Sequence, residues 1–398
     1  MKNKPAAAAP GLSTLSVWGG EQDYPLYERS TQVPVVHSVS YGYDDIDTWH
    51  KVALEEEPGH IYSRNTNPTV GVFENKVKAL EQAEAATSFA SGMAAISNTF
   101  GAFLKPGDRV VSIKDSYGGT NRLFTEFLPK LNIEVVLCDT LNHAEIEKHV
   151  RDKCTMLYLE SPTNPSLKIT NIKKMAHIAN ECGALVVVDN TFATPVNQKP
   201  LNLGADIVLH SASKYLGGHA DALGGVACGS HKLIKKLYQY REINGATLAP
   251  MDAYSFIRGM KTLALRIERQ NQNAMTIAHW LSKHPKVEQV NYPGLESHAN
   301  HDIAKEQMSG FGGMLSFSIT GGLEGIKKVL PKLKLAHMAA NLGCVETVVG
   351  PPLTTSHVEC TLEERAAAGI PEGLIRYSTG IEDVEDLLAD LEHALSYA

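Results

Sequence analysis

Short apolar segments alternate with helical segments between residues 86 and 230 of this 398-residue chain. The apolar segments are 86–90, 106–112, 133–138, 156–159, 184–188, 204–209 and 224–228. This alternation is typical of an α/β fold, in which helices cover both faces of a mostly parallel sheet. Parallel sheets bind ligands at the carboxyl ends of their strands. The sequence therefore predicts a ligand site at one edge of the sheet.

Polar residues follow several of these segments at the point where each predicted strand ends. They are Ser91, Tyr117, Asn164, Asp189 and Lys214. The carboxyl ends of parallel strands meet at one edge, so we expect these side chains to converge. Convergence of five such groups predicts a functional site.

Lys214 lies in the segment His210–Gly218, directly after an apolar strand. A desolvated ammonium must be paired or must lose its proton, and a neutral lysine amine can form a Schiff base with a carbonyl. The alternative is that Lys214 caps a loop and extends to water. The segment alone favours this alternative, and the rest of the chain has to decide.

Two other segments could bind an anion. Ser91-Gly92-Met93 forms a strand-to-helix turn, where free backbone N–H groups and the helix dipole favour negative charge. Arg64 lies in a turn-rich segment and suits phosphate or carboxylate, although a surface salt bridge is the alternative.

Composition excludes several classes of protein. The formal net charge of −7 argues against a nucleic-acid partner. The six cysteines show neither a C-x-x-C pair nor zinc-site spacing, so we expect no metal and reduced thiols. There is no 18-residue apolar run and no signal-peptide core at the start, so we expect no membrane association and a cytoplasmic protein.

The length of the chain suits two domains preceded by an arm. We expect residues 1–62 to form an N-terminal arm that packs on a neighbouring subunit, because a long, weakly patterned start is often such an arm. Residues 63–255 would form the large domain and residues 256–398 a smaller α/β domain, whose predicted strand 374–378 contains Arg376.

Asp189, Lys214 and Arg376 together fit a pyridoxal phosphate (PLP) enzyme. Such an enzyme needs a lysine for the cofactor aldehyde, a carboxylate for the ring nitrogen and a cradle for the phosphate. Arg376 could bind a substrate carboxylate in a bidentate manner. A nicotinamide dehydrogenase would need the motif G-x-G-x-x-G after the first strand, and the chain lacks this motif. A non-catalytic interaction protein has no need of these three residues together.

The motifs resemble those of the Cys/Met-metabolism PLP-dependent family, which includes cystathionine γ-lyase and γ-synthase, methionine γ-lyase and canavanine γ-lyases. The resemblance covers residues from about 30 to the C-terminus, and the matching segments are 62–69, 91–93, 117–120, 160–165, 188–191, 211–215 and 375–378. It implies the aspartate-aminotransferase-like fold (fold type I), with a mostly parallel seven-stranded sheet and a smaller C-terminal α/β domain. It also implies a homotetramer, built as a dimer of catalytic dimers.

The resemblance also implies roles for individual residues. Lys214 would bind the cofactor and move protons, Asp189 would pair with the ring nitrogen, and Tyr117 would stack on the ring and take part in catalysis. The other expected cofactor-binding residues are Gly92, Met93, Asn164, Thr191, Ser211 and Ser213, with Tyr62 and Arg64 from a neighbouring subunit. The expected substrate-binding residues are Arg376, Asn164, Glu346 and Thr347.

The implied reaction is γ-elimination from an L-homoserine-type amino acid. The alternative is γ-replacement, as in a cystathionine γ-synthase or an O-acylhomoserine sulfhydrylase. Candidate substrates are cystathionine, methionine, O-acylhomoserine and a non-sulfur analogue such as canavanine. His60 stands where relatives that bind cystathionine often have an acidic residue, and Gly119 stands where methionine γ-lyases tend to have a cysteine. The hydroxyl-rich segment 351–357 suggests a polar distal group, although neutral loop drift explains it equally well.

Overall fold

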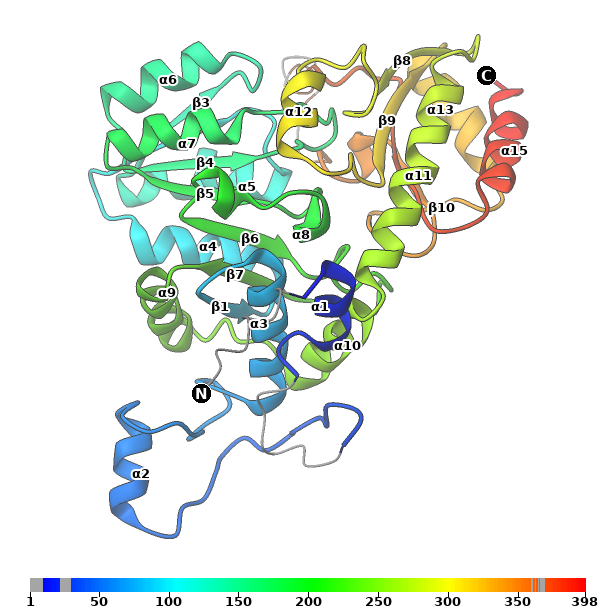
Figure 1. The fold of residues 1–398 in the computed structure, drawn as a ribbon. Coiled ribbons are helices and arrows are strands. Elements are labelled where there is room, and N and C mark those ends of the chain that lie inside the picture. Colours follow the sequence, from blue (N-terminus) through cyan, green and yellow to red (C-terminus); the bar gives the residue numbers. More distant parts are fainter. Residues whose placement is uncertain (1–9, 22–29, 359–360, 362, 364, 366–368) are drawn as a thin grey trace, which may run out of the picture.

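The computed structural model describes residues 10–21, 30–358, 361, 363, 365 and 369–398. The predicted arm therefore lies partly outside the described residues, namely at positions 1–9 and 22–29. The described part of the arm contains α1 (Leu12–Trp18) and α2 (Ile46–Ala53), and the segment that carries α2 projects below the body of the molecule (Figure 1).

A seven-stranded sheet forms the centre of the large domain, with the strand order β1-β7-β6-β5-β4-β2-β3. The central strands run parallel, and β7 runs antiparallel to both of its neighbours. This confirms the predicted fold class. The strands are β1 (Ala85–Phe89), β2 (Arg109–Ile113), β3 (Glu134–Cys138), β4 (Met156–Glu160), β5 (Leu185–Asp189), β6 (Ile207–Ser211) and β7 (Gly225–Gly229).

Helices cover both faces of this sheet because its strands are apolar on both sides. Val187 of β5 packs into the core on one face, whereas Val186 and Val188 pack into the core on the other. The first core includes residues of α4 and α9, and the second includes residues of α6 and α7. The helices of this part of the chain are α3 (Pro68–Glu81), α4 (Gly92–Phe103), α5 (Gly118–Arg122), α6 (His143–Asp152), α7 (Ile172–Glu181), α8 (Thr194–Asn197), α9 (His231–Asn244) and α10 (Pro250–Met260).

A second sheet of five strands follows, with the order β10-β11-β12-β9-β8. Its residues pack with α11 and α15 around a separate core that includes Phe317, Tyr377 and Leu391. The predicted domain boundary near residue 256 falls inside α10, and the boundaries stay a prediction. The elements are β8 (Val287–Asn291), β9 (Met314–Ile319), β10 (His337–Met338), β11 (Val348–Gly350), β12 (Leu374–Ser378), α11 (Leu263–Leu281), α12 (His301–Gln307), α13 (Gly322–Val329) and α15 (Val384–Leu395).

Arg266 of α11 connects this helix to the loop that follows β6 and to α10 by hydrogen bonds. Its guanidinium donates to the backbone carbonyls of Tyr215, at 2.9 Å, and Gly259, at 3.0 Å. Gly218 has a φ of +73°, and a Cβ at this position would collide with the same guanidinium. Gly218 is therefore required for two reasons. Its positive φ disfavours other residues, and the Arg266 guanidinium leaves no room for a Cβ.

Gly218→Ala should destabilise the protein more than the same substitution at a matched glycine. Gly183 has a φ of +71° and no atom within 4 Å of its Cβ position, so Gly183→Ala reports the backbone strain alone. We expect a loss of about 1–2 kcal/mol for Gly183→Ala and about 2–4 kcal/mol for Gly218→Ala, measured by urea unfolding of both variants. Equal losses would mean that the contact with Arg266 adds nothing.

Candidate active site

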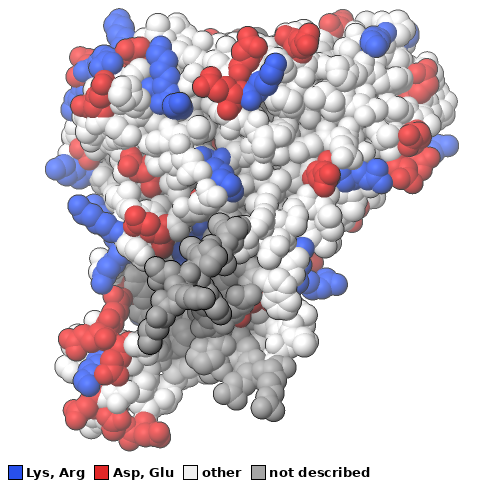
Figure 2. All heavy atoms as spheres, viewed as in Figure 1, with Lys and Arg blue, Asp and Glu red and all other residues white. Residues whose placement is uncertain are grey.

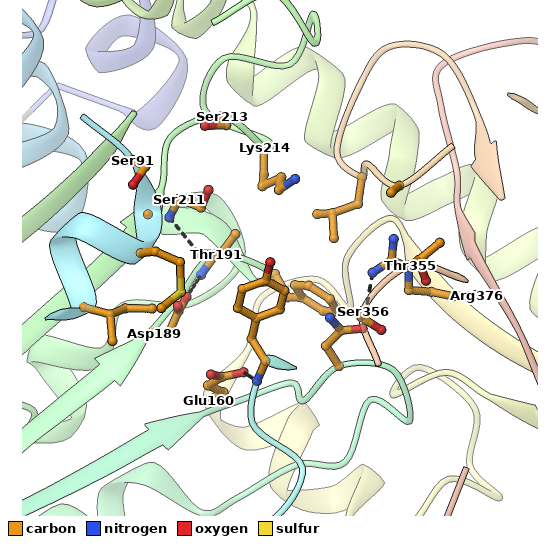
Figure 3. Close-up of a pocket in the computed structure, with 18 of the residues that line it drawn as sticks. Ser91, Glu160, Asp189, Thr191, Ser211, Ser213, Lys214, Thr355, Ser356 and Arg376 are labelled. Atoms are coloured by element: carbon orange, nitrogen blue, oxygen red, sulfur yellow. Dashed lines mark hydrogen bonds between the residues drawn. The ribbon is translucent and has the colours of Figure 1, made fainter. Parts of the chain in front are cut away.

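A cavity of about 250 Å³ lies where the predicted residues converge, at the carboxyl ends of β4, β5 and β6 (Figure 3). The second sheet closes it from the other side through Arg376 of β12. The predicted site residues that line the cavity are Gly92, Met93, Tyr117, Asn164, Asp189, Thr191, Ser211, Ser213, Lys214 and Arg376.

Lys214 projects into this cavity from the loop after β6. Its Nζ donates to Asn341 Oδ1 at 2.8 Å. Burial lowers the pKa of Lys214, and the positive charge of Arg376 lowers it further. Both effects favour the neutral amine, which is the nucleophilic form. The amine faces a cavity that Asp189 and Arg376 also line, which favours the Schiff-base interpretation over the loop cap.

Asp189 and Glu160 end two adjacent parallel strands and are paired in register. Asp189 Oδ1 accepts a hydrogen bond from Thr191 N at 2.9 Å. Burial raises the pKa of Asp189, although the hydrogen bonds from Thr191 oppose this. Burial, and after it the charge of Asp189, raise the pKa of Glu160 well above its usual value. Two adjacent buried carboxyls rarely both ionise, so we expect Asp189, with its hydrogen bonds from Thr191, to carry the charge and Glu160 the proton.

The predicted anion cradle forms at the start of α4. Ser91 caps this helix by accepting from Ala94 N at 3.0 Å. A Cβ on Gly92 would lie 2.7 Å from that of Ser211, so the glycine keeps the helix N-terminus open toward β6. The helix dipole, free N–H groups and nearby serine hydroxyls suit a phosphate.

Arg376 is buried at the opposite side of the cavity. Its Nη1 donates to Asn164 Oδ1 at 3.4 Å, and its Nη2 donates to Asn341 O at 3.1 Å. Burial lowers the pKa of Arg376 to about 10, so the group remains a cation at neutral pH. A buried guanidinium that bonds neutral amide oxygens suits a carboxylate ligand.

Four predicted site residues do not line the cavity. Tyr62 is exposed in the arm, with the Arg64 guanidinium 5.4 Å from its ring centre. Thr347 is fully buried, and its hydroxyl donates to Glu382 Oε2 at 2.9 Å, so this hydroxyl is engaged away from the cavity. Glu346 precedes it in the same segment. His60 also lies elsewhere, 2.9 Å from the Thr66 hydroxyl through Nδ1.

Sequence reasoning assigned no role to several residues that the structure places at the site. Glu160 was not among the predicted site residues. Its Oε2 accepts a hydrogen bond from Tyr117 N at 2.9 Å and so positions the backbone of the tyrosine. Its position at the end of a predicted strand could have identified Glu160 as a site residue from the sequence. Asn341 contacts both Lys214 and Arg376, but the segment around it carries no recognisable pattern. Thr355 and Ser356 belong to the hydroxyl-rich segment 351–357, for which the sequence did suggest a role, and they also line the cavity.

The hydroxyls of the segment 351–357 have partners within that segment. Thr354 and Thr355 donate to Pro351 O at 3.2 and 3.0 Å. Ser356 Oγ lies 2.9 Å from His357 Nδ1. The number of hydroxyls in this loop therefore does not by itself specify a polar substrate group.

Comparison with known proteins decides the family. Residues 13–396 match the family described as Cys/Met metabolism PLP-dependent enzyme. The chain belongs to this family. The predicted resemblance and the PLP cofactor are thereby confirmed, and so is the assignment as a PLP-dependent lyase.

Curated relatives and solved structures agree with this assignment. An L-methionine gamma-lyase of Fusobacterium nucleatum subsp. polymorphum is 45% identical over 97% of this chain and 98% of its own. A cystathionine gamma-lyase of Bacillus subtilis is 46% identical over 90% of this chain and 94% of its own. A solved cystathionine gamma synthase of Xanthomonas oryzae superposes with a TM-score of 0.92 at 35% identity, covering 98% of each chain.

The assignment of charge to Asp189 and of a proton to Glu160 predicts different effects of two isosteric amides. Asp189→Asn removes a charge and should weaken PLP binding about 10–100-fold, since charged hydrogen bonds contribute about 1.5–3 kcal/mol. Glu160→Gln resembles the protonated acid and should change PLP binding less than about threefold. Absorbance titration of the apoprotein with PLP measures both. A larger loss in Glu160→Gln than in Asp189→Asn would reverse the assignment.

Proposed function

We propose that this enzyme is a γ-lyase that cleaves the bond between Cγ and a heteroatom of an L-homoserine-type amino acid. The single observation that carries the proposal is the cavity, which Lys214, Asp189 and Arg376 line together. The names of two relatives, a methionine and a cystathionine gamma-lyase, support elimination over the alternative of γ-replacement.

Each residue has a defined task in this proposal. Lys214 would hold the cofactor through Nζ, and its amine would take the proton from the substrate Cα. Asp189 would hold the cofactor ring nitrogen, and the turn at Ser91–Met93 with Ser211 and Ser213 would hold its phosphate. PLP, when bound, supplies an electron sink for the charge left on the substrate carbon.

Substrate orientation depends on Arg376 and Tyr117 in the same proposal. Arg376 would bind the α-carboxylate, because its guanidinium is buried at the side of the cavity opposite the anion cradle. Tyr117 would stack on the cofactor ring and could protonate the leaving group. Asn164 would contact the cofactor ring hydroxyl and support Arg376, from which its Oδ1 accepts a hydrogen bond.

We also propose a homotetramer built from catalytic dimers, with Tyr62 and Arg64 completing the phosphate site of a neighbouring subunit. Tyr62 ends the arm, Arg64 lies two residues beyond it, and neither lines the cavity of its own chain. Helix α2 of the same arm exposes 78% of Ile46 and 50% of Trp49, which suits contact with another subunit. Acidic side chains gather around this helix, whereas both signs mix elsewhere on the face shown in Figure 2.

Among the described residues, none of the helices has the length and apolar character that crossing a lipid bilayer requires. We propose that the protein works in the cytoplasm, as the cysteine content also suggests.

The proposed function predicts a coloured protein whose colour depends on Lys214. Wild type reconstituted with PLP should absorb visible light and release a 2-oxo acid from at least one of L-cystathionine, L-methionine, O-acetyl-L-homoserine and L-canavanine. Lys214→Ala should lose the visible band and at least about a thousandfold of the activity, since it lacks the proton-accepting amine. Lys168→Ala is the matched control, because this lysine is partly buried in an ion pair with Asp115. A colourless wild type would contradict the proposal.

Substitution of Arg376 should affect the substrate and not the cofactor. Arg376→Lys keeps the charge but loses the bidentate geometry, so we expect KM to rise about tenfold or more for every α-amino acid substrate. Steady-state kinetics measure KM, and the visible spectrum serves as the control and should not change. An unchanged KM would remove Arg376 from substrate binding.

A further inference from the structure

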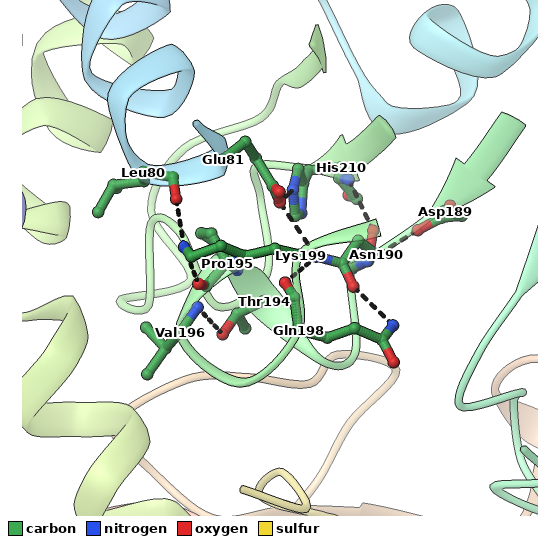
Figure 4. A network of polar contacts seen from close by, with 12 residues as sticks. Leu80, Glu81, Asp189, Asn190, Thr194, Pro195, Val196, Gln198, Lys199 and His210 are labelled. Atoms are coloured by element: carbon green, nitrogen blue, oxygen red, sulfur yellow. Dashed lines mark hydrogen bonds and ion pairs between the residues drawn. The ribbon is translucent and has the colours of Figure 1, made fainter. Parts of the chain in front are cut away.

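A network of buried amide side chains begins at the carboxyl end of β5, and its amides do not line the cavity (Figure 4). Asn190 directly follows Asp189, the last residue of β5, and Gln198 directly follows α8. Asn190 is 0% exposed and Gln198 is 2% exposed. Amides removed from water to this extent are costly unless their donors and acceptors are paired, so the partners of both side chains are informative.

The side chain of Gln198 connects the two turns that follow β4 and β5. Its Nε2 donates to Ser161 O at 2.8 Å and to Asn190 Oδ1 at 3.0 Å. Ser161 directly follows Glu160, and Asn190 directly follows Asp189. One amide group therefore bonds the residues next to both carboxyls at the edge of the sheet.

Asn190 attaches this connection to the neighbouring elements. Its Nδ2 donates to Gln198 O at 2.9 Å and to Glu81 Oε1, at the end of α3, at 3.0 Å. Its backbone N–H donates to Leu209 O of β6 at 2.9 Å. Asn190 and Gln198 thus bond each other twice, once through the two side chains and once through the backbone of Gln198.

A third amide fixes Gln198 from α12, which lies between β8 and β9 in the chain. Gln307 Nε2 donates to Gln198 Oε1 at 3.1 Å and to Thr170 O at 3.2 Å. Gln307 Oε1 accepts a hydrogen bond from Ile172 N at 3.3 Å. A chain of three amides therefore runs from the residue after Asp189 to the part of the chain that builds the second sheet.

The partners of these amides determine their orientation. Each of the three side chains uses both N–H donors and its carbonyl oxygen. If the amide of Gln198 were rotated by 180°, its oxygen would face Ser161 O and its nitrogen would face the Nε2 of Gln307. Only one orientation is compatible with both neighbours, and removal of the amide would leave several buried groups without a partner.

We propose that Gln198 is a positioning residue that sets the separation between the turns after β4 and β5, and thereby the placement of Asp189 in the cavity. Gln198 does not line the cavity, so it acts through the backbone next to Asp189 and Glu160. The strength of a hydrogen bond depends on its distance and angle, so a displaced carboxylate holds a ligand less tightly. The inference rests on the proposed role of Asp189 in holding the cofactor ring nitrogen.

Asn197, the residue before Gln198, provides a matched control. Asn197 is 3% exposed, and its Nδ2 donates to Asn271 Oδ1 of α11 at 3.1 Å. Asn271 Nδ2 donates back to Asn197 Oδ1 at 2.9 Å. The side chain of Asn197 thus makes buried amide contacts of the same kind, but it bonds α11 and neither of the two turns. Its loss should lower Tm without any effect on cofactor binding.

The test compares wild type with Gln198→Met, Gln307→Met and Asn197→Leu. Methionine and leucine have about the size of the amides that they replace, but they have no N–H donor. The measurements are the PLP dissociation constant from absorbance titration of the apoprotein, the visible circular dichroism of the bound PLP, which reports how its ring is held, and Tm.

Gln198→Met should weaken PLP binding about tenfold, which corresponds to about 1.4 kcal/mol, and should change the visible circular dichroism. Asn197→Leu should lower Tm and leave the other two quantities at their wild-type values. Gln307→Met retains both hydrogen bonds of Gln198 Nε2 but frees its Oε1, so we expect PLP binding to weaken about threefold. If Gln198→Met yields no folded protein, Gln307→Met decides alone.

Two results would overturn the inference. In the first, Gln198→Met, or Gln307→Met where it decides alone, lowers Tm while the PLP affinity and the circular dichroism stay at wild-type values. In the second, Asn197→Leu weakens PLP binding as much as Gln198→Met, which means that the contacts with the two turns have no special effect. A wild type that binds no PLP would instead refute the proposed function, and the inference with it.

Discussion

The parallel register of β4, β5 and β6 is the constraint on which the site depends. Glu160 pairs with Asp189, and Asp189 pairs with Leu209. The carboxyl ends of the three strands therefore lie side by side along one edge of the sheet. The chain leaves the sheet at this line, and Thr191, Ser213 and Lys214, which follow these strands, line the cavity. Because the central strands are mostly apolar, the residues by which this sheet reaches the cavity lie at or just after the ends of its strands, such as Glu160, Asp189 and Ser211.

Burial sets the charge states of the groups at this edge. It favours the neutral form of both Lys214 and Asp189, and nearby charges then determine how far each group shifts. Arg376 adds to the effect on Lys214, whereas Thr191 and His210 oppose the effect on Asp189. In one cavity, burial thus favours the neutral amine of Lys214, while hydrogen bonds from Thr191 favour the charged form of Asp189.

Local patterns predicted the sheet and one side of the site. The alternation over residues 86–230 determines the layers, and strand ends identified Asp189, Lys214 and the Ser91 turn, because the connection from strand end to sheet edge is local. The other side depends on long-range packing. Asn341 lies in a loop without periodicity, and Thr347 was assigned to the substrate although it bonds Glu382 of a later segment. No short sequence window contains either contact.

Helix α11 connects the two sides of the cavity. Arg266 near its start donates to the carbonyls of Tyr215 and Leu216, the residues directly after Lys214. One turn later, Gln270 donates to Cys344 O at 2.8 Å, in the segment that contains Asn341. The same rigid helix therefore fixes the loop of the lysine and the loop of its hydrogen-bond partner. The distance between Lys214 and the second sheet is then set by α11, and a change in its packing would alter substrate binding without any change in a residue of the cavity.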